Sequence, residues 1–169
     1  GDLHITSQPD EEGKRLRVVS PFLEAQVSGT FDYAALPSIF LYTAASCMPS
    51  LTGLTEQQPD TAAYASFDLR LYSAEPLRQL LGIPLRITSP VSASGTLDAA
   101  TRTLQLALAA PEVSYGKEDL RQVDLRVESN LQSLQANLQL LRRMKKNYVQ
   151  LGVDAHSASD RLTTRFYWN

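Results

Sequence analysis

The residue types of a hydrolase site occur close together in one segment of the chain, at Asp154, His156, Ser157, Ser159 and Asp160. In a Ser-His-Asp site a carboxylate orients the histidine, and the histidine takes a proton from the serine. These residues, however, surround one predicted turn at the end of a strand, on its solvated side. The pattern therefore favours a solvated hairpin end, and we expect no catalytic residue and no enzymatic activity.

The residues that commonly bind metal ions are few. His4 and His156 are the only histidines, and Cys47 is the only cysteine, which excludes an internal disulfide and a thiolate cage. The acidic run 10–12 lacks the alternating oxygen ligands of a calcium loop. We expect no metal site and no cofactor, and we expect Cys47 to be a small buried apolar residue and not a reactive thiol.

One basic cluster stands near a predicted hairpin turn and consists of Arg142, Arg143, Lys145 and Lys146. A charged hairpin tip that keeps the protein soluble is the simpler interpretation. Contact with an anionic phospholipid headgroup, or with an acidic patch of a partner, is the functional alternative.

Length and charge restrict the class of protein. The chain has 169 residues, a formal net charge of −2 and 20% charged residues, which suits one domain over residues 1–169 and gives no electrostatic basis for binding nucleic acid. No run of about 18 apolar residues is present that could span a bilayer as a helix.

Apolar and polar residues alternate with a period of two through most of the second half of the chain. Successive side chains of a strand point to opposite faces, so each run predicts a strand with one apolar and one polar face. The apolar face would either close a core or line a path for acyl chains. The residues expected on it are Phe67, Leu69, Leu71, Leu104, Leu106, Leu108, Val123, Leu125, Val127, Leu134, Leu138, Leu140, Val149, Leu151, Val153, Leu162, Phe166 and Trp168.

The expected fold is mainly β, a β-rich α+β chain with a curved antiparallel meander sheet or β-groove and two short helices. Short connections between strands impose antiparallel neighbours. The helices are expected at 33–48 and at 74–81, the second between a Ser73 cap and a Gly82 stop. Because strands are predicted at both ends, at 3–6 and 162–168, we expect the domain to be excised from a longer chain.

Several sequence segments resemble the large TamB-like proteins of Bacteroidetes, which belong to the AsmA-like superfamily of cell-envelope proteins. These segments are the predicted strand at 20–23, the residues before the first predicted helix at 28–33, the predicted turn at 49–51, and the last residues of the chain at 160–169. The resemblance covers most of the chain and includes no catalytic signature.

The resemblance implies a periplasmic segment of an inner-membrane-anchored or outer-membrane-associated protein. In this family an apolar-lined β-groove conducts phospholipid between membranes, and members are linked to outer membrane biogenesis. The implied partners are phospholipid acyl chains, neighbouring strands of the full-length chain and outer-membrane assembly proteins. The alternative is a closed β-sandwich, a structural or adhesive module of a secreted surface protein. Unpaired strand edges would also permit self-association.

Overall fold

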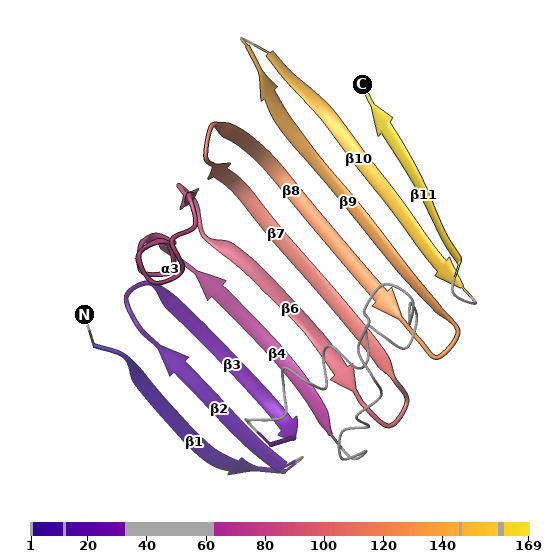
Figure 1. The fold of residues 1–169 in the computed structure, drawn as a ribbon. Coiled ribbons are helices and arrows are strands. Elements are labelled where there is room, and N and C mark those ends of the chain that lie inside the picture. The colour runs from indigo at the N-terminus through magenta and orange to yellow at the C-terminus, as the bar shows by residue number, and fades with distance from the viewer. Residues whose placement is uncertain (1, 12, 33–62, 146, 159–160) are drawn as a thin grey trace.

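The computed structural model describes residues 2–11, 13–32, 63–145, 147–158 and 161–169. Their fold is one antiparallel sheet in the order β1-β2-β3-β4-β6-β7-β8-β9-β10-β11, with β5 paired to β7 (Figure 1). The elements are β1 (His4–Asp10), β2 (Gly13–Val19), β3 (Leu23–Thr30), β4 (Tyr64–Leu71), α3 (Glu75–Leu81), β5 (Leu85–Ile87), β6 (Val91–Asp98), β7 (Thr103–Tyr115), β8 (Glu118–Ser129), β9 (Ser133–Met144), β10 (Asn147–Ala158) and β11 (Arg161–Trp168).

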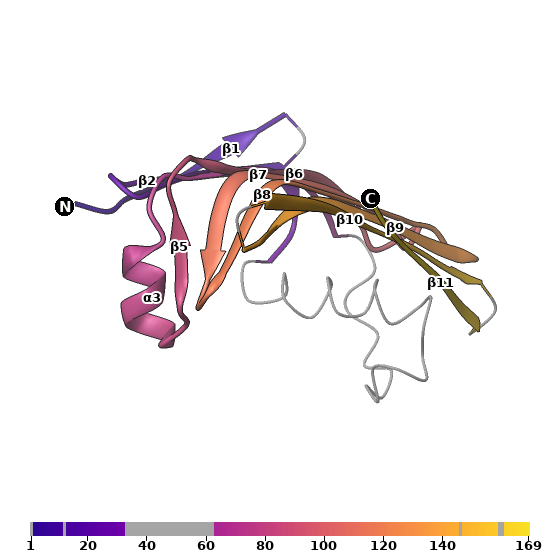
Figure 2. The same cartoon turned by 90° about the horizontal axis from the view of Figure 1, so that it is seen from above.

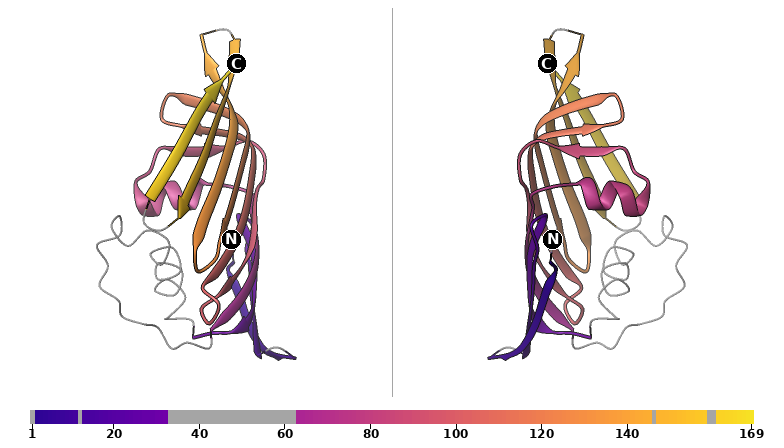
Figure 3. Two further views of the ribbon diagram at one scale, coloured as in Figure 1. Left: turned by 90° about the vertical axis from the view of Figure 1, so that its right-hand side faces the viewer. Right: turned by 90° about the vertical axis from the view of Figure 1, so that its left-hand side faces the viewer.

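The expected fold class is confirmed: the chain is mainly β, and its sheet is open and antiparallel. Edge-on views show that the described strands form a single layer (Figure 3). The closed β-sandwich does not describe these residues, because no second sheet of described strands packs on the first. The first expected helix, at 33–48, and Cys47 lie outside the described residues.

The second expected helix is present as α3 and begins at Glu75. Ala74, not Ser73, is the N-cap residue, and no side chain caps this end, although the Ser73 hydroxyl accepts a bond from the Glu75 N–H at 3.3 Å. The helix ends as expected at Gly82, whose φ of 65° suits a residue without Cβ and whose N–H donates to the Arg78 C=O at 2.9 Å.

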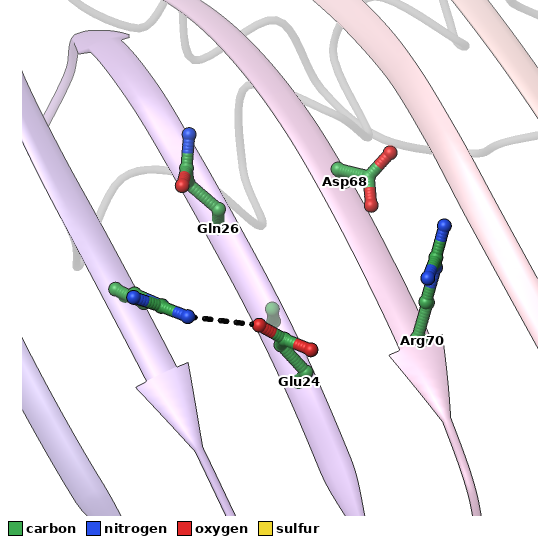
Figure 4. Close-up of a pocket in the computed structure, with 6 residues that line it drawn as sticks. Glu24, Gln26, Asp68 and Arg70 are labelled. Carbon is green, nitrogen blue, oxygen red and sulfur yellow. Dashed lines mark hydrogen bonds and ion pairs between the residues drawn. The ribbon is translucent and has the colours of Figure 1, made fainter.

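The sheet is curved, and its apolar side is concave. Figure 4 looks onto the polar face, where Gln26, Glu24 and Asp68 are labelled, and Figure 1 looks onto the opposite, apolar face. Seen from above, the sheet bends toward this apolar side, and α3 and β5 lie on the same side at one end (Figure 2).

A β-bulge in β8 adds to the curvature. Arg121 pairs with Leu141 and Asp124 with Gln139, so β8 has one more residue than β9 between these pairs. Gln122, within the bulge, has a φ of 49°. The ends of β7 and β8 beyond this point bend toward the concave side, where β5 extends the sheet by pairing with β7 (Figure 2).

Gly95 lies where two backbones approach closely under an aromatic ring. It pairs with Phe67 of β4, and a Cβ built at Gly95 would lie 2.8 Å from Phe67 Cζ and would overlap the Gln105 carbonyl oxygen of β7. The overlap with backbone cannot be relieved by a side-chain rotation. Glycine at this position is therefore required by packing between β6 and β7.

We expect Gly95→Ala to lower the free energy of unfolding by about 1–3 kcal/mol, because the methyl group forces β6 away from β7. Ser94→Ala is the matched control, since Ser94 is exposed on the polar face of the same strand, and it should change stability by less than about 0.5 kcal/mol. Urea denaturation followed by circular dichroism measures both values. Equal stabilities of the two variants would contradict the packing argument.

Candidate functional site

The candidate site is the concave face of the sheet, which the strand register assembles. Residues directly opposite one another in neighbouring strands share a face, and Leu106, for example, lies between Gly95 of β6 and Val127 of β8. Applied across the sheet, this rule puts every one of the expected apolar residues, from Phe67 to Trp168, on the same face.

The apolar face extends over more strands than the alternation of apolar and polar residues predicts. The register adds Ile5 of β1, Leu16 and Val18 of β2, Val27 of β3 and Leu97 of β6. Their strands are short or interrupted by small residues, so their alternation alone was a weak signal. With strands about 4.8 Å apart, the ten strands of the main path make a face roughly 43 Å wide.

Charges occupy only the ends of this face. Among the described strands, the charged residues at its register positions are Lys14, Glu118 and Arg142, each at or near a strand end. The opposite face of the sheet contains Arg17 of β2, Asp68 of β4 and many other polar residues. The sheet is thus strongly amphipathic, with a continuous hydrocarbon surface on its concave side.

Burial on the concave face is uneven. Leu97, Ala99 and Leu104 form a buried cluster that Ala63 and Val127 contact, and Leu71 and Ala74 are buried beside the start of α3. Leu106, Leu125, Leu138 and Leu151, which lie away from the strand ends on β7 to β10, remain partly exposed. Exposure is greatest on β11, where Phe166 is 66% and Trp168 75% exposed.

The basic cluster does not form one cationic surface. Arg142 is on the concave face and donates from Nε and Nη2 to the two carboxylate oxygens of Glu118, at 2.7 and 2.8 Å. Arg143 is on the polar face and donates to Asp119 at 3.3 Å. Lys145 is exposed in the β9–β10 turn, and Lys146 lies outside the described residues.

The Glu118–Arg142 pair has an electrostatic consequence at this end of the face. Hydrogen bonds from Arg142 lower the pKa of Glu118, and the same bonds raise the pKa of Arg142. A carboxylate with a lowered pKa stabilises the folded state at pH values above its unfolded-state pKa. That contribution is lost as the pH falls through the lowered, folded-state pKa.

The residues of the hydrolase pattern do not converge. Asp154 and His156 are on the polar face, where Asp154 accepts a hydrogen bond from Asn137 Nδ2 at 2.9 Å. Ser157 is on the opposite face and fully buried. Because the strand alternates, the serine and the histidine cannot meet, and Ser159 and Asp160 lie outside the described residues.

The polar face has a shallow hollow between β2, β3 and β4 (Figure 4). Glu24 accepts a hydrogen bond from Arg17 at 3.0 Å and another from Tyr72 at 3.3 Å, and these bonds, that of Arg17 first, lower its pKa. Gln26, Asp68 and Arg70 complete the rim. Cross-strand ion pairs of this kind favour solvation of the convex surface.

The described residues contain neither a membrane-spanning helix nor a metal-binding cluster. None of their helices is long and apolar enough to cross a membrane. No group of three or more His, Cys, Asp or Glu side chains among them is arranged to hold a metal ion.

Comparisons with protein-family models, with curated protein sequences and with solved structures gave no match to this chain.

Ser129 is a buried polar residue on the apolar face, opposite Leu104 and Leu134, and its Oγ has no hydrogen-bond partner among the described residues. We expect Ser129→Ala to raise the free energy of unfolding by about 1 kcal/mol, because it removes the desolvation cost of an unpaired hydroxyl. Thermal denaturation measures the change. A loss of stability would show that the hydroxyl is satisfied in solution.

Glu118→Gln should lower the melting temperature slightly at neutral pH, because it removes the carboxylate that Arg142 binds. The difference in melting temperature between the variant and the unmodified chain should disappear in strong acid, where Glu118 is protonated in both the folded and the unfolded state. Glu128→Gln, an exposed change on the polar face of the same strand, is the matched control. A deficit of equal size at neutral and strongly acid pH would contradict an ionic origin.

Proposed function

We propose that this chain is a non-enzymatic, β-rich segment of a TamB-like cell-envelope protein and that its concave face contacts phospholipid acyl chains. The observation that carries the proposal is the continuous apolar face of one open, curved sheet, with its charges confined to the strand ends. The resemblance to TamB-like proteins implies the rest of the proposal: a location in the periplasm and a role in phospholipid transport to the outer membrane or in outer-membrane assembly.

Partly exposed apolar side chains on the concave face favour an apolar ligand. Complete burial of a Leu or Val side chain stabilises a complex by about 1.5–3 kcal/mol. Leu106, Leu125 and Leu138 are partly exposed, so covering them with acyl chains lowers the free energy of the complex by part of that amount. Within the described part of the chain, no second sheet covers this face. A wide, uncharged surface of this kind suits a flexible hydrocarbon ligand better than a small polar one.

The position of charge supports the same ligand class. Lys14 lies at one end of the face. The Glu118–Arg142 pair lies at the other end, where Lys145 follows in the β9–β10 turn. An amphiphile lying on the face can therefore place its acyl chains on the central strands and its headgroup near an end. Since Arg142 and Arg143 are held by carboxylates, we propose that Lys145, of the three cluster residues that the structure describes, contacts an anionic headgroup.

Four consecutive positions of β7 test the proposal. In a Cys47→Ser background, single cysteines replace Gln105, Leu106, Ala107 and Leu108, and each carries a polarity-sensitive fluorophore. Addition of vesicles of phosphatidylethanolamine and phosphatidylglycerol should shift the emission to the blue at 106 and 108 only. Positions 105 and 107, on the polar face, are the matched controls.

Equal shifts at all four positions, or no shift at any of them, would contradict lipid binding by the concave face. Circular dichroism of each labelled variant checks that the sheet is intact. Native mass spectrometry of the unmodified chain provides a second test, in which co-purified phospholipid is the expected result.

A further inference from the structure

Two hairpin turns lie side by side at one end of the sheet, which we call the basic edge (residues 115–119 and 142–145). The β7–β8 turn contains Lys117 and the β9–β10 turn contains Lys145, and both side chains are exposed. The two turns are neighbours because β8 and β9 are paired in the sheet (Figure 1). Two hairpins that are separate in the sequence therefore contribute lysines to one surface.

The acidic residues of the basic edge are already paired with arginines. Arg142 donates to both carboxylate oxygens of Glu118, and Arg143 donates to Asp119 at 3.3 Å. The two lysines form no ion pair within the described part of the chain. The arginines and carboxylates neutralise each other, and the two lysines leave the basic edge with a positive charge.

Exposed apolar side chains accompany these lysines. Tyr115 precedes the β7–β8 turn and is 53% exposed, and Met144 precedes the β9–β10 turn and is 52% exposed. Tyr115 pairs with Glu118, and alternation along β9 puts Met144 on the same side as Arg142, so both lie on the concave face. The apolar face thus continues through a tyrosine and a methionine to the lysines at the turns.

The opposite end of the strands has a different charge balance. Its β1–β2 turn has Asp10, Glu11 and Glu12 in the sequence, with Lys14 following, and its β8–β9 turn contains no charged residue. Leu131 of the β8–β9 turn is 58% exposed, so this end also presents an apolar side chain to solvent. The basic edge differs from this end because its exposed apolar residues stand beside positive charge.

Apolar, aromatic and cationic side chains in this order match the layers of a bilayer surface. Tyrosine favours the level of the headgroups, apolar side chains favour the acyl boundary, and each lysine near an anionic surface contributes about fivefold in affinity. We propose that the basic edge docks on a bilayer that contains anionic phospholipid. Tyr115 and Met144 then insert at headgroup level, and Lys117 and Lys145 contact lipid phosphates.

This docking rests on the proposed function for the class of ligand and adds the place where the sheet meets the membrane. With the basic edge on the bilayer, the concave face is continuous with the acyl region through Tyr115 and Met144. Charge complementarity sets the orientation, because the acidic β1–β2 turn is at the end of the strands that is directed away from the anionic surface.

Co-sedimentation with vesicles tests the docking. The unmodified chain should bind vesicles that contain phosphatidylglycerol, should bind phosphatidylcholine vesicles weakly, and should lose binding at high salt. Lys117→Gln combined with Lys145→Gln should lower the affinity for the anionic vesicles by about 25-fold. Lys14→Gln combined with Arg161→Gln, the matched control at the opposite end, should change it by less than about twofold. Circular dichroism checks that both variants are folded.

A fluorophore at single cysteines measures insertion. In a Cys47→Ser background, the label at Met144→Cys should shift its emission to the blue with anionic vesicles, whereas the label at Leu131→Cys should not. Equal binding to both kinds of vesicle, unchanged affinity of the double lysine variant, or equal shifts at the two labels would overturn the docking.

The docking and the acyl-chain contact fail separately. Blue shifts at positions 106 and 108 that do not depend on Lys117 and Lys145 would support lipid on the concave face and overturn docking through the basic edge. Co-sedimentation that depends on the two lysines, without shifts at 106 and 108, would support the docking and contradict acyl-chain binding by the face.

Discussion

Antiparallel pairing of neighbouring strands, with a register shift only at the bulge between β8 and β9 among the described strands, is the constraint on which the rest of this structure depends. Each strand of the path bonds its neighbours through alternate residues, and the side chains between share a face with those directly opposite. A slip by one residue in any pair would move an entire row of leucines to the polar side. The apolar face is thus specified cooperatively by all the hairpins, and small residues such as Gly95 allow the backbones to approach closely enough.

The consequence is a single layer with two chemically distinct sides. Most small antiparallel domains pack the apolar side of a sheet on a second layer. Here the described strands curve around that side, and α3 lies at one end of it (Figure 2). Leu97 and Leu104 are buried. Leu106, two residues further along β7, and Leu125, on the neighbouring strand β8, are partly exposed. The same feature underlies the proposed contact with acyl chains.

The residue types alone suggested chemistry that the fold does not assemble. A serine, a histidine and an aspartate occur within four residues of one another, but neighbouring positions of a strand point apart, and Ser157 is buried on the face opposite His156. The basic cluster is divided in the same way, with Arg142 and Arg143 on opposite faces and each held by a carboxylate of β8. Proximity in sequence is therefore a poor guide to a site on a strand.

The sequence by itself determined the local periodicity: which segments are strands, where most turns fall, and that Leu104, Leu106 and Leu108 share a side. It could do so because alternation is a property of one strand and needs no partner. Tertiary structure decided which strands are neighbours, that Ile5 and Leu16 continue the same face, that β8 is bulged, and that the sheet curves and stays open. Those features depend on hydrogen bonds and packing between segments distant in sequence, which no local pattern encodes.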